Sequence, residues 1–238
     1  MNILRIKLNH HERVKPCHFS SESLAYSNAN STLIFNEMRR NKPTQKRSKD
    51  RLRTVLSAAK AELSERGYSD LSMSRVCARA KVKPASVYRY WPDKTSILEE
   101  LMDEFEHGIS NQIQLRIAEE PNLEHFIGYF LSDLQFYCSQ ESWILQAQIG
   151  MRAELSMHDY HEQAITRLSE IVRTGLSNYC YFDSKESGLR LSRSVVLVIE
   201  TFLMALGRNI MVGKSSKGLR ADFEEVIMSQ IEHLRIST

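Results

Sequence analysis

The chain has 238 residues, 42% of them hydrophobic, and a formal net charge of +3 at pH 7. This length allows one large or two small domains with a proper hydrophobic core. Nine glycines, five prolines and no strongly alternating Val/Ile/Thr runs predict an all-α protein rather than a β-protein. No apolar run approaches the roughly 18 to 20 residues that cross a bilayer, so we expect no membrane partner.

Residues 1–43 show no sustained hydrophobic period, and we expect a disordered N-terminal extension there. Candidate metal ligands occur in it: His10, His11, Cys17 and His18. Without a regular element to hold their geometry, we predict no metal site. Met38 directly precedes the basic run Arg39–Lys49, which is typical of an N-terminal arm, so we hypothesise that translation begins at Met38. An intact mass of the natively expressed protein would test this.

From about Ser48 the pattern becomes helical, and Gly67 supplies a stop signal. Its apolar stripe is Leu52, Val55, Leu56, Ala59 and Leu63. A second, short helix follows the N-cap residue Ser72 and buries Met73, Val76, Cys77 and Ala80. A third begins at Pro84, where a first-turn proline is tolerated. Residues 44–94 therefore read as a three-helix domain that contains a helix-turn-helix.

In this third helix, Val87 and Trp91 are four residues apart and should face inward. The outer face then carries Ala85, Ser86 and Arg89, with Tyr88 and Tyr90 at its margins. A short helix with a small, hydroxylic, aromatic and cationic face is suited to reading the DNA major groove. An ordinary helical hairpin is the alternative, but the cations around the turn argue against it: Arg79, Lys81, Lys83 and Arg89.

The charge distribution supports a polyanion-binding module. Residues 38–94 hold 16 Lys/Arg and 5 Asp/Glu, a net charge of +11. Residues 95–238 hold 12 Lys/Arg and 21 Asp/Glu, a net charge of −9. A basic block that coincides with the helix-turn-helix pattern predicts double-stranded DNA as the partner.

Three segments, Val55–Tyr68, Ser72–Ala80 and Ser86–Lys94, together resemble the N-terminal domain of the TetR family of transcriptional regulators. The resemblance implies a larger helical ligand-binding and dimerisation domain in residues 95–238, binding of a palindromic operator, and no cofactor. It also implies that Ser86, Tyr88 and Lys94 contact DNA phosphate. Arg89 is the expected base reader, because a guanidinium can bind guanine O6 and N7 together. The remaining implied DNA contacts are Ser72, Ser74, Arg75, Lys83, Pro84 and Tyr90.

The chain departs from the family pattern at three places. Lys81 stands where the family has a turn glycine, so a left-handed conformation there would be strained. Pro84-Ala85 replaces the usual Lys-Gly at the start of the reading helix, and Tyr90 replaces a histidine. No known operator can therefore be transferred to this chain.

From residue 93 onward, four helices and a final pair complete the pattern, with Asp93 as the first N-cap and Pro121 as a break. We expect them over residues 93–119, 122–139, 141–155, 158–180, 189–212 and 219–236. The last two form a hairpin around the loop Gly213–Gly218 and predict a homodimer through residues 189–236, by a four-helix bundle. The alternative is that both belong to a monomer core.

Aromatic and sulfur-containing side chains in the body could line an apolar ligand cavity, with a few polar groups for specificity. The candidates are Phe126, Phe130, Tyr137, Trp143, Gln146, Met151, Glu154 and Phe202. His158 and His161 are three apart and could hold a metal, but a solvated helix start is the favoured reading. Four widely spaced cysteines and the lack of a signal peptide pattern at the N-terminus predict a cytoplasmic protein with reduced thiols.

These features predict a dimeric DNA-binding regulator, expected to be a repressor, that a small apolar or amphipathic ligand releases from its operator. The alternative is a DNA binder of the same kind without an inducer, controlled by a protein partner or acting in chromosome organisation. We expect no enzyme, because a helical enzyme would need a convergent set of titratable residues that the sequence does not present.

Overall fold

A computed structural model describes residues 46–120 and 122–236. The predictions for residues 1–43, for a start at Met38 and for the His/Cys group therefore lie outside the described residues. The described residues form helices and connecting segments without a strand, which confirms the all-α prediction.

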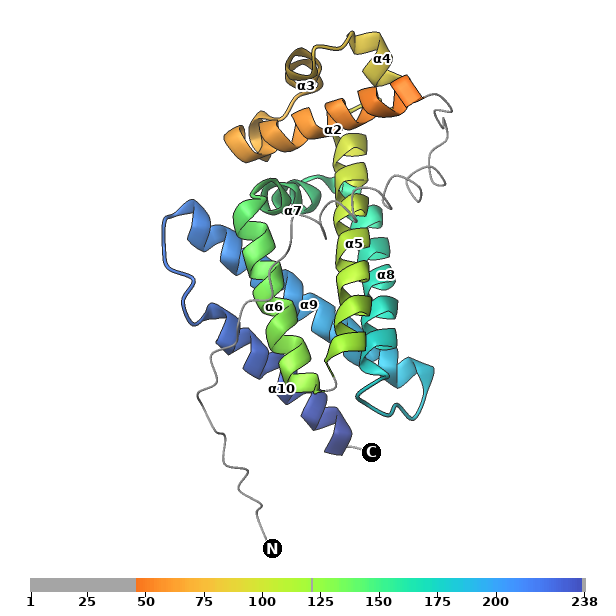
Figure 1. The fold of residues 1–238 in the computed structure, drawn as a ribbon, viewed down its shortest axis with the longest axis vertical. Coiled ribbons are helices and arrows are strands. Elements are labelled where there is room, and N and C mark those ends of the chain that lie inside the picture. The colour runs from red at the N-terminus through yellow and green to blue at the C-terminus, as the bar shows by residue number, and fades with distance from the viewer. Residues whose placement is uncertain (1–45, 121, 237–238) are drawn as a thin grey trace, which may run out of the picture.

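The N-terminal part is built from three helices and a short 3-10 turn. They are α2 (Lys46–Arg66), η1 (Tyr68–Asp70), α3 (Met73–Ala80) and α4 (Pro84–Tyr88). The body comprises α5 (Lys94–Glu119), α6 (Leu123–Gln140), α7 (Trp143–Ala153), η2 (Leu155–Met157), α8 (His158–Leu176), α9 (Lys185–Met211) and α10 (Leu219–Ile236). In Figure 1, α3 and α4 lie on the side of α2 that faces away from the body, and α7 lies directly below α2.

Local capping explains where the helices begin. The Ser72 hydroxyl accepts a hydrogen bond from the Arg75 backbone N–H at 3.4 Å, as predicted for the start of α3. Asp93 caps α5 through a capping box, in which its Oδ1 accepts from the Ser96 N–H at 2.8 Å. A second capping box, between Ser184 and Ser187, starts α9 at Lys185. The predicted start at residue 189 was therefore four residues too late.

The segment predicted as one helix over 158–180 ends earlier, at Leu176. Residues 177–179 form a turn instead, in which the Tyr179 N–H donates to the Leu176 carbonyl at 2.9 Å. Tyr179 then packs against Phe126 with ring centroids 5.4 Å apart, and its hydroxyl donates to the Glu120 carbonyl. The Tyr179 side chain makes these tertiary contacts from the turn. The spacing of apolar residues in the sequence does not reveal them, and so it did not predict the earlier end of the helix.

One continuous apolar core runs from α2 to α10. Trp91, Leu98 and Trp143 are at most 2% exposed and lie at the junction of the two parts of the chain. The helix α5 runs from the helix-turn-helix into the body, beside α8 (Figure 1). Its 26 residues correspond to about 39 Å, so this helix physically links the two ends of the molecule.

Partly buried ion pairs hold α5 to its neighbours. The Arg116 guanidinium donates to Asp133 on α6 at 2.5 Å, and Arg167 on α8 donates to Glu106 at 3.0 Å. Burial raises the pKa of the Asp133 and Glu106 carboxyls, against the opposing effect of the paired arginines. Because each pair joins α5 to a different helix, α5 is fixed along its length within the body.

One helix bears on the expectation that the chain has no membrane segment. Among the described helices, α9 is long and apolar enough to cross a membrane by length and composition alone. Its apolar stretch is interrupted by Glu200, so no uninterrupted apolar run stands out in the sequence. A helix of this kind is weak support for a membrane span, since core helices of globular proteins pass the same criteria. α9 packs against α8 and α10 in this structure.

Candidate nucleic-acid interface

The turn between α3 and α4 adopts the conformation that the family resemblance implied. Lys81 has φ 54° and ψ 41°, in the left-handed region. The turn is closed by the Val82 N–H, which donates to the Cys77 carbonyl at 3.1 Å. The chain therefore places a lysine where a glycine would fit without strain.

The two short helices present the predicted inner faces. Val76 and Val87 are each 1% exposed, and Trp91 is 2% exposed, with its Nε1–H donating to Glu100 on α5 at 3.2 Å. This anchoring fixes the orientation of α4. The outer face of the pair is left to solvent, on the side of the molecule away from the body (Figure 1).

One cation of the turn region has a structural role. The Arg79 guanidinium donates to Glu62 at 2.6 Å and also bonds Glu65, both on α2. It thereby clamps α3 to α2. Arg79 was predicted to be one of the surplus cations available to DNA. Its charge is instead paired with two glutamates of the preceding helix, a pairing that depends on how α3 packs against α2.

Most of the predicted DNA contacts lie at the surface of α3, the turn and α4. The solvent-exposed members are Ser74, Arg75, Lys83, Pro84, Tyr88 and Arg89, and the partly exposed ones are Ser72, Ser86 and Tyr90. The Ser72 hydroxyl is already engaged in capping α3, as described above. Their contacts with DNA stay predictions.

Arg89 and Tyr90 contact each other. The Arg89 guanidinium donates to the Tyr90 hydroxyl at 3.0 Å and lies 4.9 Å from the centre of its ring. Tyr90 also packs at a tilted angle on Trp91, with ring centroids 6.1 Å apart. The Arg89 side chain, predicted to contact a DNA base, is thus held by the Tyr90 ring, which itself packs on the buried Trp91.

Lys94 lies in a different environment from the other predicted contacts. Its ammonium is 2.8 Å from Glu154 Oε1, a residue at the end of α7 in the body, and 4.3 Å from the centre of the Tyr68 ring. The Tyr68 hydroxyl donates to the same Glu154 carboxylate. The hydrogen bond to Glu154 raises the pKa of Lys94, and the Lys94 ammonium lowers the pKa of Glu154.

Two further residues of α7 complete this joint between the N-terminal domain and the body. The Gln146 side chain accepts a hydrogen bond from the Tyr68 backbone N–H at 3.2 Å. At Gly150, an added Cβ would lie 2.3 Å from the Tyr68 ring, so only glycine allows this approach. Gln146, Gly150 and Glu154 are spaced by four residues and share one face of α7. This joint was not predicted from the sequence, although the spacing of those three residues is a signal for it.

The predicted ligand-binding residues lie at several different places in the described part of the chain. Gln146 and Glu154 belong to the joint just described. Trp143 is buried at the same junction, under the Lys60 ammonium at 4.7 Å from its ring. The others pack in separate aromatic and sulfur contacts of the core: Phe126 on Phe130, Tyr137 on Phe105, Phe202 on Phe223, and a buried Met151. Their role in ligand binding stays a prediction.

A surface cavity of about 150 Å³ lies elsewhere, between α7 and α9. Its lining comprises Leu145, Ile149, Leu203, Met204, Gly207, Arg208, Met211 and Val212. None of these residues belongs to the predicted ligand-binding set.

One of the two α8 histidines considered as metal ligands, His161, lies in an ionic network. His161 Nε2 is 2.9 Å from Glu200 on α9, which also contacts Arg152 of α7 at 3.2 Å. The described residues contain no group of three or more His, Cys, Asp or Glu with metal-binding geometry. Cys77, Cys138 and Cys180 are free thiols in the interior, and burial raises the pKa of Cys138 to about 12. Cys17 lies outside the described residues.

The fold and the surface of α3 and α4 place this protein in a class: all-helical proteins with an N-terminal helix-turn-helix of the kind that binds DNA. Residues 55–101 match the family model described as "Bacterial regulatory proteins, tetR family". The N-terminal domain is therefore a TetR-family DNA-binding domain, which confirms the resemblance seen in the sequence.

Two solved structures and one curated relative show how far the similarity extends. A TetR-family transcriptional regulator from Streptomyces coelicolor has a TM-score of 0.59 at 19% identity, covering 77% of this chain and 99% of that one. The Bacillus subtilis regulator FadR, in complex with stearoyl-CoA, has a TM-score of 0.55 at 18% identity, covering 77% and 97%. The nucleoid occlusion factor SlmA of Pasteurella multocida is 34% identical over 80 residues.

That last match covers 33% of this chain and 40% of SlmA. The likeness to the solved structures, at under 20% identity, shows a shared fold alone. The sequence similarity thus identifies the DNA-binding domain, while the body has only this similarity of fold.

Proposed function

We propose that this protein is a transcriptional regulator that binds a palindromic operator as a homodimer, through residues 72–94 of each subunit. The observation that carries the proposal is the exposed cationic and hydroxylic surface of α3 and α4, held in a TetR-family domain by buried Val87 and Trp91. We propose regulation rather than enzymatic turnover, in the cytoplasm, and this is supported by the match to the family model.

A dimer is proposed because one short reading helix supplies too little affinity and specificity on a single half-site. The partner surface we propose is the exposed face of α9, where large apolar side chains recur every seven residues. They are Leu197, Met204 and Met211, at 43%, 36% and 63% exposure. Val226 of α10, 46% exposed, is the further apolar residue expected in a bundle formed with the second copy.

A repressor released by a small apolar or amphipathic ligand is the form of regulation we favour. It is supported by the fold shared with FadR, whose structure contains stearoyl-CoA. A ligand can release DNA only by binding better to the conformation whose half-site spacing misfits the operator.

The experiment that tests DNA recognition is selection of bound fragments from random DNA, followed by sequencing. An enriched palindrome is the expected result, and recovery of unselected DNA would contradict sequence-specific binding. Added apolar compounds should raise the thermal unfolding temperature and release the selected DNA if an inducer exists.

The second candidate is a DNA binder without an inducer that acts in chromosome organisation. The similarity to the nucleoid occlusion factor SlmA over 80 residues favours it. The two candidates differ in the distribution of binding sites on the chromosome, because an operator lies at one or a few promoters while an organising factor occupies many dispersed sites. Mapping of bound sites in cells would separate them.

A further inference from the structure

Lys94 lies at the edge of the proposed DNA surface, yet its ammonium contacts the body. It is the first residue of α5, directly after the N-cap Asp93 and three residues beyond Trp91, which anchors α4. Its side chain is 35% exposed, and that of its partner Glu154 is 31% exposed. The contact is therefore reachable from solvent, and an anion from outside can compete for the ammonium.

The Glu154 carboxylate resembles a DNA phosphate in the features that a lysine recognises. Both carry negative charge and offer oxygen acceptors to an ammonium, which has three N–H donors. Glu154 holds the ammonium over the Tyr68 ring, at 4.3 Å from its centre, and the Tyr68 hydroxyl orients the same carboxylate. A phosphate approaching Lys94 would meet the charge of Glu154 as well as the charge of the lysine.

We propose that Glu154 competes with the DNA backbone for Lys94, so that the body lowers DNA affinity through this ion pair. The inference rests on the proposed function, DNA binding through residues 72–94. Because a phosphate contact carries no base information, Glu154 should affect operator and random DNA alike.

The location of Glu154 explains how the body could modulate this competition. One face of α7 carries Gln146, Gly150 and Glu154 against the N-terminal domain, while Leu145 and Ile149 on another face line the cavity with α9. A shift of α7 against α9 would therefore move the carboxylate relative to Lys94. Strengthening or loosening the ion pair then changes the number of phosphates that the domain can bind.

The direct test is Glu154→Gln, which removes the charge and keeps an acceptor for the Tyr68 hydroxyl. Affinity for the selected operator and for random DNA should both rise about 2- to 5-fold, the range of an exposed ion pair, with their ratio unchanged. The matched control is Glu124→Gln, an exposed acid in the first turn of α6, at the end of the body remote from α3 and α4 (Figure 1). It changes the net charge equally and should leave both affinities unaltered.

A double-mutant cycle assigns the effect to Lys94. In a Lys94→Ala background, Glu154→Gln should no longer change DNA affinity. Unchanged or weaker binding by Glu154→Gln in the wild-type background would overturn the competition, because it would mean that Glu154 is neutral or positions Lys94 for DNA. If the wild-type protein bound no DNA at all, the proposed function would fail.

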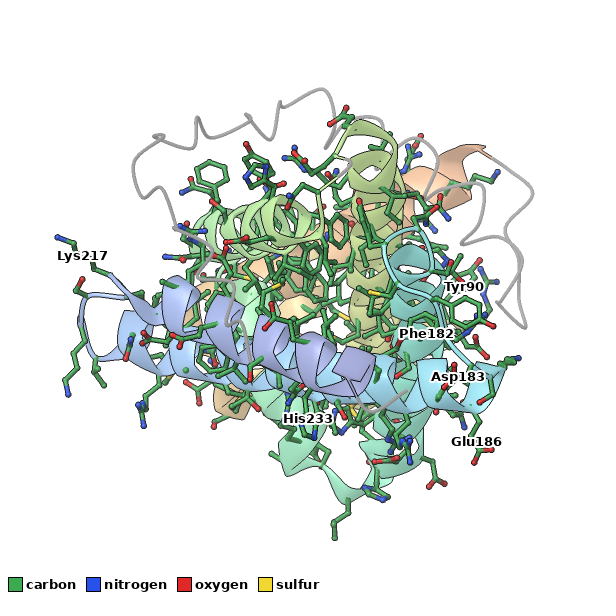
Figure 2. All side chains as sticks on the ribbon, turned by 90° about the horizontal axis from the view of Figure 1, so that it is seen from below. Tyr90, Phe182, Asp183, Glu186, Lys217 and His233 are labelled. Carbon is green, nitrogen blue, oxygen red and sulfur yellow. The ribbon has the colours of Figure 1, made fainter. Side chains whose placement is uncertain are left out.

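A chemical measurement tests the ion pair independently of DNA. Acylation of Lys94 by an amine-reactive reagent, followed by mass spectrometry, should be faster in Glu154→Gln than in the wild-type protein. Lys217 is the internal reference, since it is exposed on the loop between α9 and α10, at the opposite side of the molecule from Tyr90 (Figure 2). Equal Lys94 reactivity in both proteins, at equal Lys217 reactivity, would contradict the ion pair on which the proposal depends.

Discussion

Among single residues, Arg89 is the one that we expect to give the proposed reading surface its specificity. It is exposed at the end of α4 and contacts only its neighbour Tyr90 among the hydrogen bonds described for it. A guanidinium in this position can form a bidentate contact with guanine.

Arg89→Ala should therefore cost about 1–3 kcal/mol of operator binding and relax base preference at one position of each half-site. Arg89→Lys, which keeps the charge but not the fork geometry, is the matched control and should retain binding to random DNA. The measurement is sequence selection with both variants. An unchanged base preference in Arg89→Ala would show that another residue reads the operator.

Gly150 is the residue on which the close approach of α7 to Tyr68 depends. An added Cβ would lie 2.3 Å from Tyr68 Cδ2, while at Gly207, also buried and helical, the nearest atom would be 3.5 Å away. Gly150→Ala should therefore destabilise the protein by about 1–3 kcal/mol through overpacking. Gly207→Ala should be neutral or slightly stabilising, since alanine favours the helix. Denaturant unfolding of both variants checks the pair, and equal effects would contradict the tight joint.

At the scale of elements, the turn between α3 and α4 contains a strained backbone conformation that lowers the stability of the folded protein. Lys81 adopts a left-handed conformation that disfavours every residue with a Cβ. We expect Lys81→Gly to raise the free energy of unfolding by roughly 1 kcal/mol, because glycine adopts this conformation without strain. The greater conformational entropy of glycine in the unfolded chain offsets part of the gain.

Two substitutions at the same position provide the controls, since both lose the same charge. Lys81→Asn should be close to neutral, because asparagine tolerates this conformation better, and Lys81→Ala should bring no gain. The thermal unfolding temperatures of the three variants rank their stabilities. A gain in Lys81→Ala equal to that in Lys81→Gly would point to charge repulsion rather than backbone strain.

Besides α5, the helix α7 contacts both the N-terminal domain and the body. It contacts α2 and η1 on one side and α8 and α9 on the other. The Arg152–Glu200 ion pair fixes it to α9, and the Glu154–Lys94 ion pair fixes it to α5. An 11-residue helix with such contacts on both sides is suited to pass a change in the body to the DNA-binding surface.

At the scale of the whole molecule, the proposed dimer determines whether two reading helices can engage a palindrome. Met204 lies at the centre of the apolar stripe on α9. Met204→Glu should dissociate the dimer, because a buried unpaired charge at an interface is costly, and should weaken operator binding more than tenfold. Leu115→Glu on α5, 55% exposed and outside the stripe, is the matched control and should remain dimeric. Sedimentation of both variants gives the answer, and a dimer that survives Met204→Glu would place the interface elsewhere.

Much of the fold follows from local rules that the sequence states directly. Ser72 and Asp93 cap α3 and α5 at the predicted residues, and Pro84 opens α4 as its first residue. The buried face of the helix-turn-helix, including Val87 and Trp91, was also predicted. These features depend on residues within a few positions of one another, so they can be found without knowing the tertiary structure.

The all-helical fold and the helix-turn-helix could be predicted from the sequence alone, because helix periodicity and caps are local, and the family followed from the resemblance of short segments. The contact of Lys94 with Glu154, the clamp of Arg79 on α2, and the contact of Gln146 and Glu154 with the DNA-binding domain became visible only in the tertiary structure. The partners in the joint of Lys94 and Tyr68 with α7 are separated by 60 or more positions in the chain. Which of many charged and polar side chains meet at that distance depends on how the helices pack, and no local pattern specifies it.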